Sequence, residues 1–262
     1  MKKIIGFCIV VIFLFSGLAS ASLVDGLVAY YSFSGNANDD SGNGNHGTVN
    51  NAILTSDRHG TSNSAYYFDG VNDSIRVSDS PELDIINQIT MAAWIAPSQQ
   101  KTQHIIRKGA HVNGSYAAPY GLSLSGTGDL IFSLRPNLNF TQVRRHGYNL
   151  NEWTFLLGTY DGSMMSLYVN GLLEASTSVA GLLTANDLPL LIGTRLNLPA
   201  DTFLGGLDEI RLYNRALDNS EIQDLYSSNT PVPEPSTIFL LGGSLICLQA
   251  FRKIDMKKRM RK

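Results

Sequence analysis

Short apolar runs of strand length, each closed by Gly, Asn, Asp or Pro, dominate the chain between residues 27 and 214. Long helical periodicity is missing from this region. Ten runs show the pattern: LVAYYSF, SAYYFDG, DSIRVSD, ITMAAWIAP, YGLSLSG, LIFSLRP, WTFLLGTYDG, MMSLYVNG, LPLLIGT and DEIRLYN. Strands this short, separated by turn residues, predict two packed antiparallel sheets rather than a helical protein.

Two local patterns describe the later strands. In residues 153–160, Phe155 falls on one face of a strand and Leu156 on the other. Both faces are therefore partly apolar, as in a strand at the centre of a sandwich. Asn170-Gly171 stands between two apolar runs, which predicts a type I′ hairpin.

One short helix is predicted near the end of this region. Asp218 can cap it, Glu221 follows three residues later, and Ile222 and Leu225 form an apolar edge. The sequence thus predicts an all-β sandwich of two antiparallel sheets with one short C-terminal helix.

Residues 1–21 have the pattern of a secretory signal peptide. Lys2 and Lys3 precede an apolar run over residues 4–15, and small residues ending in Ala-Ser-Ala follow it. This arrangement predicts cleavage before Ser22 and export of the rest of the chain. An uncleaved N-terminal anchor is the alternative.

The exported segment has no cysteine, because Cys8 lies in the signal peptide and Cys247 in a C-terminal apolar run. Disulfides, thiolate catalysis and thiolate metal sites are therefore excluded from it. Residues 22–229 are long enough for a single domain that is stable through burial alone.

Charge is distributed unevenly along the chain. Of the 20 Lys and Arg residues, two precede position 22 and seven follow position 251, whereas only one of the 22 Asp and Glu residues, Asp255, lies in these end segments. The segment between them has 11 basic and 21 acidic residues, a net charge of −10. Such a charge repels phosphate backbones, so we expect no nucleic-acid partner.

The C-terminal part, residues 230–262, combines three features in order. Its apolar run, residues 238–251, is shorter than the roughly 20 residues of an ordinary spanning helix, and a basic tail follows at 252–262. The positive-inside rule leaves that tail in the cytoplasm. The run is preceded by a box over residues 232–237 that consists of Val232, Pro233, Glu234, Pro235, Ser236 and Thr237.

These features resemble the PEP-CTERM sorting signal. The resemblance implies an exosortase as partner, an inner-membrane anchor through the C-terminal helix before processing, and a final location at the cell surface or in the extracellular matrix of a Gram-negative bacterium. A plain C-terminal anchor is the alternative.

The order of motifs in residues 22–229 resembles the laminin-G-like, concanavalin A-type jelly-roll family. Six motifs carry the resemblance: GLVAYYSFSGNANDDSGNGNHGTV, YYFDGVNDSIRV, ITMAAWIAP, WTFLLGTYDGSMMSLYVNGLLEAS, LLIGT and FLGGLDEIRLYNRALDNSEIQDLY. It implies a two-sheet antiparallel jelly roll, flanked here by a signal peptide and a C-terminal membrane segment. Because this fold hosts lectins, adhesins, enzymes and passive spacers, the resemblance does not name a ligand.

An early loop, NDDSGNGNHG, crowds oxygen-bearing side chains among glycines, which suits a hard cation. The family resemblance implies a structural calcium ion held by Asp39 and Asp208, with oxygens from around Asn45. The alternative is an Asx-rich turn without metal. The histidines lack the spacing of a zinc site.

Catalytic motifs are missing from the sequence. The resemblance extends to laminarinase-type enzymes, whose E-x-D-x-x-E motif is approached only by Glu82 and Asp84, because Asn87 replaces the second glutamate. No G-x-S-x-G elbow is present. We therefore expect no enzymatic activity, with lyase-like chemistry the remaining alternative.

A carbohydrate site in such a domain needs exposed aromatic rings and polar loop groups. The middle of the chain offers six candidates: Tyr116, Tyr120, Arg135, Arg144, Arg145 and Tyr148. The arginines could pair with uronic or sulfated polysaccharide. A solvated loop and strand edge is the alternative interpretation.

Together these patterns predict an exported surface or matrix protein that binds extracellular carbohydrate or a surface protein in an adhesion or biofilm role. A structural matrix protein without a specific ligand is the main alternative, followed by a polysaccharide-degrading enzyme.

Overall fold

The computed structural model describes residues 22–109, 111–112, 115–116, 118–195 and 201–228. The predicted signal peptide, residues 1–21, and the predicted sorting signal, residues 230–262, lie outside the described residues. Among the described residues, no helix is long and apolar enough to cross a membrane.

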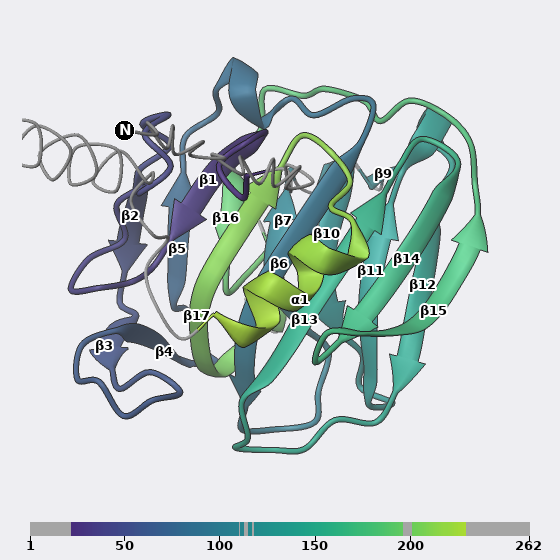
Figure 1. Ribbon diagram of the computed structural model, residues 1–262. Coiled ribbons are helices and arrows are strands. Elements are labelled where there is room, and N and C mark those ends of the chain that lie inside the picture. Colours follow the sequence, from purple (N-terminus) through teal and green to yellow (C-terminus); the bar gives the residue numbers. More distant parts are fainter. Residues whose placement is uncertain (1–21, 110, 113–114, 117, 196–200, 229–262) are drawn as a thin grey trace, which may run out of the picture.

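The chain folds into a sandwich of two antiparallel sheets, as the strand pattern predicts (Figure 1). The eight-stranded sheet has the order β15 (Leu172–Ser178), β14 (Met164–Val169), β13 (Thr154–Tyr160), β6 (Ile89–Pro97), β17 (Leu204–Tyr213), β4 (Ala65–Asp69) and β3 (Ile53–Thr55), with β1 (Leu27–Tyr31) paired to β17. The seven-stranded sheet has the order β12 (Thr141–His146), β11 (Asp129–Leu134), β10 (Tyr120–Leu124), β7 (Gln103–Lys108), β16 (Leu190–Ile192), β5 (Ser74–Val77) and β2 (Gly47–Asn50).

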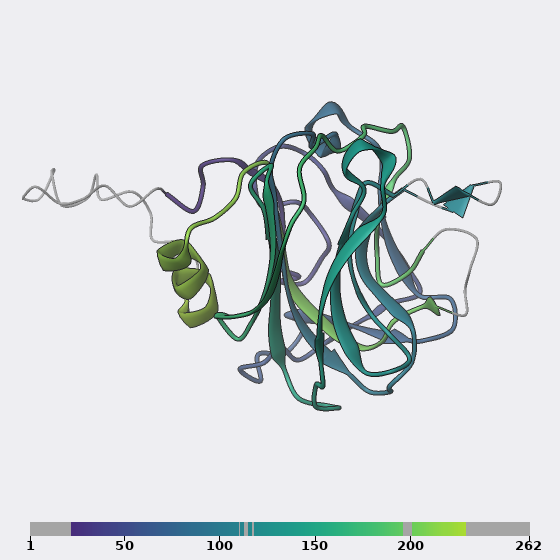
Figure 2. The ribbon, with the colours of Figure 1, turned by 90° about the vertical axis from the view of Figure 1, so that its right-hand side faces the viewer.

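Four short elements complete the fold. β8 (His111–Val112) and β9 (Ser115–Tyr116) form a separate hairpin, and two single-turn 3₁₀ helices span Pro81–Leu83 and Pro136–Leu138. The predicted helix is α1 (Asn219–Ser227). Figure 2 shows α1 on one side of the sandwich and the β8–β9 hairpin on the opposite side.

Two apolar clusters stabilise this arrangement. The main core lies between the sheets and includes Leu156 and Tyr160 of β13, whereas Phe155 and Leu157 of the same strand pack with α1 in a second cluster. This confirms the prediction that β13 is apolar on both faces. An antiparallel strand is usually solvated on one side, and here the apolar edge of α1 covers that side.

The predicted hairpin is also confirmed. Asn170 and Gly171 join β14 to β15 with φ angles of 50° and 78°, the left-handed conformations that a type I′ turn requires. The Asn170 side chain also accepts a hydrogen bond from the backbone N–H of Phe155 at 2.9 Å, which ties the turn to β13.

Gly158 of β13 allows the sheets to approach closely. A Cβ atom at this position would lie 2.4 Å from a ring carbon of Phe132, a fully buried residue of β11 in the facing sheet. The Phe132 ring therefore occupies the space that a side chain at position 158 would need.

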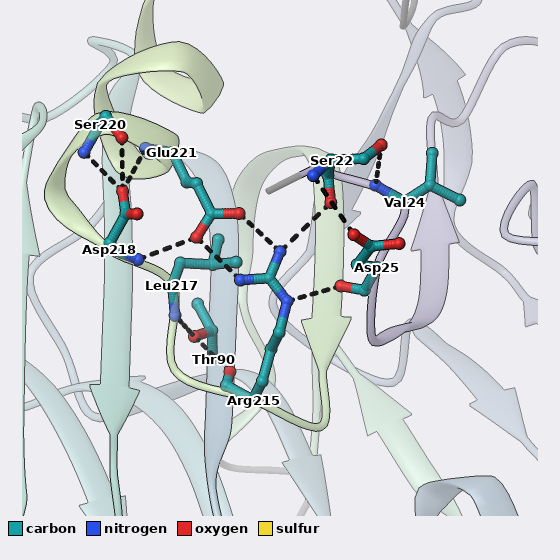
Figure 3. Close-up of polar contacts among 9 residues, drawn as sticks. All are labelled: Ser22, Val24, Asp25, Thr90, Arg215, Leu217, Asp218, Ser220 and Glu221. Carbon is teal, nitrogen blue, oxygen red and sulfur yellow. Dashed lines mark hydrogen bonds and ion pairs between the residues drawn. The ribbon is translucent and has the colours of Figure 1, made fainter. Parts of the chain in front are cut away.

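Arg215 joins the first described residues to α1 (Figure 3). Its guanidinium donates to both carboxylate oxygens of Glu221, at 2.6 and 2.7 Å, and to the backbone oxygens of Asp25 and Ser22, at 2.6 and 3.3 Å. Glu221 also accepts from the backbone N–H of Asp218, which caps α1 in the predicted capping box. One side chain thus connects residue 22 with the N-terminal end of the last helix.

Candidate functional site

The early Asx-rich loop is held to β1 through the side chain of Asp39. Its carboxylate accepts hydrogen bonds from the backbone N–H groups of Tyr30, Ser41 and Asn45 at 2.9 to 3.0 Å. The Asn45 side chain accepts from the Ser80 hydroxyl and donates to the Val28 carbonyl oxygen. Both side chains therefore serve to attach the loop to the sandwich.

Asp208, on β17, has a different partner. Its carboxylate lies 3.2 Å from the Arg58 guanidinium and accepts from the backbone N–H of Glu209. N–H donors and a guanidinium repel a cation, so the placement of Asp39, Asn45 and Asp208 does not fit a shared calcium site. No group of three or more His, Cys, Asp or Glu residues in the described part of the chain is arranged to hold a metal.

A cavity of about 670 Å³ lies beside Asp208, and we call it the acidic cavity. Its lining consists of Val24, Leu27, Tyr30, Ser32, Ser34, Asp40, Ser41, Asp57, Arg58, His59, Thr61, Ser64, Asp208 and Glu209. Arg58 is one of the lining residues, and its guanidinium also contacts Glu209, stacks 4.5 Å from the Trp94 ring and donates to the Ser228 backbone oxygen. The arginine therefore ties the end of α1 to β17.

Asp208 makes folding sensitive to pH. Burial and the charge of Glu209 raise its pKa from 3.8 to about 7, although Arg58 acts in the opposite direction. Because the folded pKa lies above the unfolded one, the stabilising contribution of protonated Asp208 is complete below pH 3.8 and is lost as the pH rises to about 7. In urea unfolding, we expect the free energy of unfolding of the native protein to fall relative to that of Asp208→Asn across this window. A difference that stays constant with pH would contradict this assignment.

The structure corrects one of the three predicted aromatic ligand residues, Tyr120. Tyr120 is only 1% exposed and its hydroxyl donates to the Leu83 carbonyl oxygen at 2.7 Å, so it belongs to the core. Tyr148 is half-buried and packs against the main core. The side chain of Tyr116, in β9, lies outside the described part of the structure.

The predicted arginines do not act as one cluster. Arg135 donates to the backbone oxygen of Leu138 at the end of β11, and Arg145 lies 3.6 Å from Glu174 of β15, where the edges of the two sheets meet. Arg144 is 52% exposed on the outward face of β12, 3.6 Å from Asp129. Of these three arginines, Arg144 is the one that points to the open face of the seven-stranded sheet.

That open face contains a second cavity, of about 360 Å³, which we call the sheet-face cavity. Its volume lies within the range of small-ligand sites. It is lined by Thr102, His104, Arg107, Ser123, Ile131, Ser133, Phe140, Gln142 and Arg195. The strand neighbours Leu122, Phe132 and Val143 point the other way, into the main core, so the cavity lies on the side of the sheet away from α1.

A β-bulge brings two of these side chains together. His104 and Arg107 are three residues apart, which in a regular strand would put them on opposite faces. The pairing of β7 with β10 shifts here, so that His104 faces Ser123 and Arg107 faces Gly121 on the outward side. Ile105 and Ile106 both enter the core instead. Bulges of this kind often redirect side chains at functional sites.

His104 is an uncharged polar group in this cavity. It is 7% exposed, and burial together with the charges of Arg107 and Arg195 lowers its pKa to about 3. Its Nε2 has no hydrogen-bond partner among the described residues, since the nearest carboxylate oxygen, of Asp201, is 4.0 Å away. A buried polar atom without a partner costs free energy that a ligand can recover.

His104, Arg107 and Arg195 are not among the site residues predicted from the sequence. In the run QHIIRK, His104 and Arg107 stand on either side of two isoleucines. The β-bulge that brings both side chains to one face of β7 cannot be recognised from these residues. Arg195 follows β16 and reaches the cavity only through the fold.

The family model described as the concanavalin A-like lectin/glucanases superfamily matches residues 38–223, and the PEP-CTERM protein-sorting motif matches residues 231–253. A search of curated proteins found no match.

Several solved structures share the fold at low sequence identity. The binding domain of Paraclostridial Mosquitocidal Protein 1 is 20% identical with a TM-score of 0.64, and the match covers 78% of this chain and 52% of that one. Domain 4 of AbnA, an extracellular GH43 arabinanase from Geobacillus stearothermophilus, solved in complex with arabinotriose, is 23% identical with a TM-score of 0.62, covering 77% and 98%. A receptor-binding domain of botulinum neurotoxin mosaic serotype C/D is 18% identical with a TM-score of 0.63, covering 79% and 52%.

This chain therefore spans about half the length of the two toxin domains and nearly all of the arabinanase domain. The sandwich, its single capped helix and the family match over residues 38–223 together place the chain in the concanavalin A-like lectin/glucanases superfamily.

Proposed function

We propose that this protein is exported, sorted to the cell surface by an exosortase, and binds carbohydrate there in an adhesion or biofilm role. The sheet-face cavity carries the proposal. It combines hydroxyls and an amide with apolar Ile131 and the ring of Phe140, and it contains the unpartnered Nε2 of His104. Carbohydrate sites use the same mixture of directional polar groups and aromatic surface.

Two comparisons support this choice. The PEP-CTERM match at residues 231–253 supports sorting by an exosortase. The arabinanase domain that shares the fold was solved with arabinotriose, which is a precedent for a sugar ligand on this architecture.

We further propose that the domain is not catalytic. The nearest approach to a glycosidase motif, Glu82 and Asp84, falls at the single-turn helix Pro81–Leu83 and its end rather than on a strand face. Asp84 accepts from the backbone N–H of Asn186 at 3.2 Å and lies 3.9 Å from the Lys108 ammonium. These two carboxylates are therefore not presented as an acid and nucleophile pair.

Retention of the purified chain on immobilised polysaccharides, in calcium and again in chelator, tests the function. Retention in both buffers is the expected result, because the carboxylates of Asp39 and Asp208 already accept from backbone N–H groups and, for Asp208, contact Arg58. Loss of retention in chelator alone would restore the predicted role for calcium. No retention in either buffer, with the domain still folded, would overturn the binding proposal in favour of a structural matrix role, and shortening of the polysaccharide would indicate an enzyme.

Phe140 provides a specific test of where the sugar binds. This residue is 55% exposed at the cavity, and an aromatic ring packed on a sugar is worth about 0.5–1.5 kcal/mol. Phe140→Ala is expected to weaken binding by a factor of about two to ten, measured by calorimetry. Leu138→Ala is the control, since Leu138 is also exposed nearby but does not line the cavity. Equal losses in the two variants would place the sugar elsewhere.

A further inference from the structure

His104 and Asp201 face each other across a gap at the sheet-face cavity. Nε2 of His104 lies 4.0 Å from Oδ2 of Asp201, which is too long for a hydrogen bond. This nitrogen is buried and has no hydrogen-bond partner among the described residues, and the whole His104 side chain is only 9% exposed. Two polar atoms at such a separation leave room for one bridging oxygen atom between them.

Backbone hydrogen bonds fix Asp201 beside the strand that carries His104. The N–H of Gly193, directly after β16, donates to the carbonyl oxygen of Ile105 in β7 at 2.9 Å. The N–H of Phe203 donates in turn to the carbonyl oxygen of Gly193 at 2.7 Å. The segment that contains Asp201 is thus held against β7 through the end of β16. The separation of the two side chains is therefore set by the sandwich itself.

Arg195 holds the Asp201 carboxylate in this position. Its Nη2 atom lies 2.7 Å from Oδ2, the same oxygen that faces His104. A carboxylate oxygen has two lone pairs, so Oδ2 can accept a second hydrogen bond. The gap therefore lies between an acceptor with remaining capacity and a nitrogen without a partner.

The chemistry of the two atoms suits a hydroxyl group. An ionised carboxylate can only accept, so a hydroxyl in the gap would donate its one hydrogen to Asp201 and accept from His104. Nε2 must then carry the single N–H of a neutral imidazole. Burial, followed by the charges of Arg107 and Arg195, lowers the pKa of His104 to about 3, so the imidazole is neutral at physiological pH.

We propose that His104 and Asp201 select the bound sugar by taking one of its hydroxyl groups between Nε2 and Oδ2. This inference rests on the proposed carbohydrate-binding function and names the atoms that discriminate between sugars. A sugar that presents a free hydroxyl at this point satisfies both atoms. A deoxy or O-methylated sugar leaves at least one of them unpaired, which carries a large penalty in a site built around a hydroxyl.

His104→Phe tests this inference with the full chain in detergent. The substitution keeps a planar ring and removes Nε2. The probes are soluble xylan, arabinan, β-glucan and polygalacturonate, each in a native gel whose retardation of the protein gives a Kd. On every probe that retards the native protein, we expect His104→Phe to weaken binding at least about tenfold. Its free energy of unfolding should not fall, because the atom removed is buried without a partner.

Two further variants separate a hydrogen-bonding role from a packing role. His104→Gln keeps a side-chain N–H donor but loses the ring, so it should retain more affinity than His104→Phe. A role in packing alone predicts the reverse order. His59→Phe is the matched control, because His59 is exposed and lines the acidic cavity instead, and it should leave the affinity unchanged.

Asp201→Asn examines the other side of the gap. The amide keeps an acceptor oxygen but loses the charge, so binding should weaken by several-fold. If one hydroxyl contacts both side chains, the losses from His104→Phe and Asp201→Asn are not additive in the double variant.

The outcomes separate this inference from the proposed function. If His104→Phe binds as tightly as the native protein, or if the two losses are additive, the inference fails while the carbohydrate-binding function stands. If His104→Phe lowers affinity and the free energy of unfolding together and His104→Gln restores neither, His104 is a structural residue and the inference also fails. If none of the four probes retards the native protein, both proposals fail.

Discussion

Replacing Arg215 with alanine is expected to lower the free energy of unfolding by about 3 kcal/mol, the lower end of the usual cost of removing one partner of a buried ion pair, because the Arg215 side chain is itself 21% exposed. Glu221 is only 1% exposed, and both its carboxylate oxygens accept from Arg215. Without the guanidinium, a buried carboxylate keeps only the Asp218 N–H as a donor in this network. The backbone oxygen of Asp25 loses its guanidinium donor as well, and that of Ser22 keeps the backbone N–H of Asp25. Urea unfolding followed by tryptophan fluorescence measures the effect.

Arg144→Ala is the control for this prediction. It removes the same charge from an exposed pair, where the arginine lies 3.6 Å from Asp129, and such pairs contribute less than about 1 kcal/mol. Arg215→Lys adds a second comparison, because lysine keeps the charge but cannot donate two parallel hydrogen bonds to Glu221. The free energy of unfolding of Arg215→Lys should therefore lie between those of Arg215→Ala and Arg144→Ala. If Arg215→Ala and Arg144→Ala lower the free energy of unfolding equally, Arg215 has no special role in joining residues 22–25 to α1.

Gly158→Ala is expected to destabilise the domain by about 3 kcal/mol, at the upper end of the usual cost of overpacking a core. The added methyl group would lie 2.4 Å from the Phe132 ring, so a sheet or the ring must move. Thermal unfolding of the purified variant measures the loss.

A double-mutant cycle with Phe132→Leu tests the cause. If the methyl group and the ring compete for one space, the second substitution recovers part of the loss and the two changes are not additive. Gly126→Ala serves as the control, since its nearest neighbour atom would be 3.5 Å away. Additive effects of Gly158→Ala and Phe132→Leu would rule out the steric explanation.

Much of the fold can be predicted from local patterns, because each pattern has a local physical cause. Asn170-Gly171 requires left-handed backbone angles, and the Asp218 and Glu221 pair satisfies the free N–H groups of a helix start. The apolar faces of β13 indicated a central strand but not what covers its outer side. That cover is α1, about sixty residues later in the chain.

The candidate site residues fall into three cases that differ in how far the sequence predicts them. Tyr120 could have been placed correctly, because it alternates with Leu122 and Leu124 on the core face of β10. His104 and Arg107 could not, since the bulge that turns them to one face depends on pairing with a distant strand.

The Asx-rich loop is the third case. Oxygen atoms that can coordinate a cation can equally well accept hydrogen bonds from N–H groups. Only the fold determines which of the two partners they have. The carboxylate oxygens of Asp39 accept hydrogen bonds from three backbone N–H groups.

The positions of the first and last described residues bear on how neighbouring copies can cooperate. Ser22 accepts a hydrogen bond from Arg215 and Ser228 accepts one from Arg58, next to α1, whereas the sheet-face cavity opens on the outer face of the seven-stranded sheet, away from α1. Copies held side by side on a surface would present several such cavities together. A long repetitive polymer could then engage many copies at once, and the second and later contacts would form at high effective concentration. Weak affinity for a single sugar unit is then compatible with firm attachment of a whole surface.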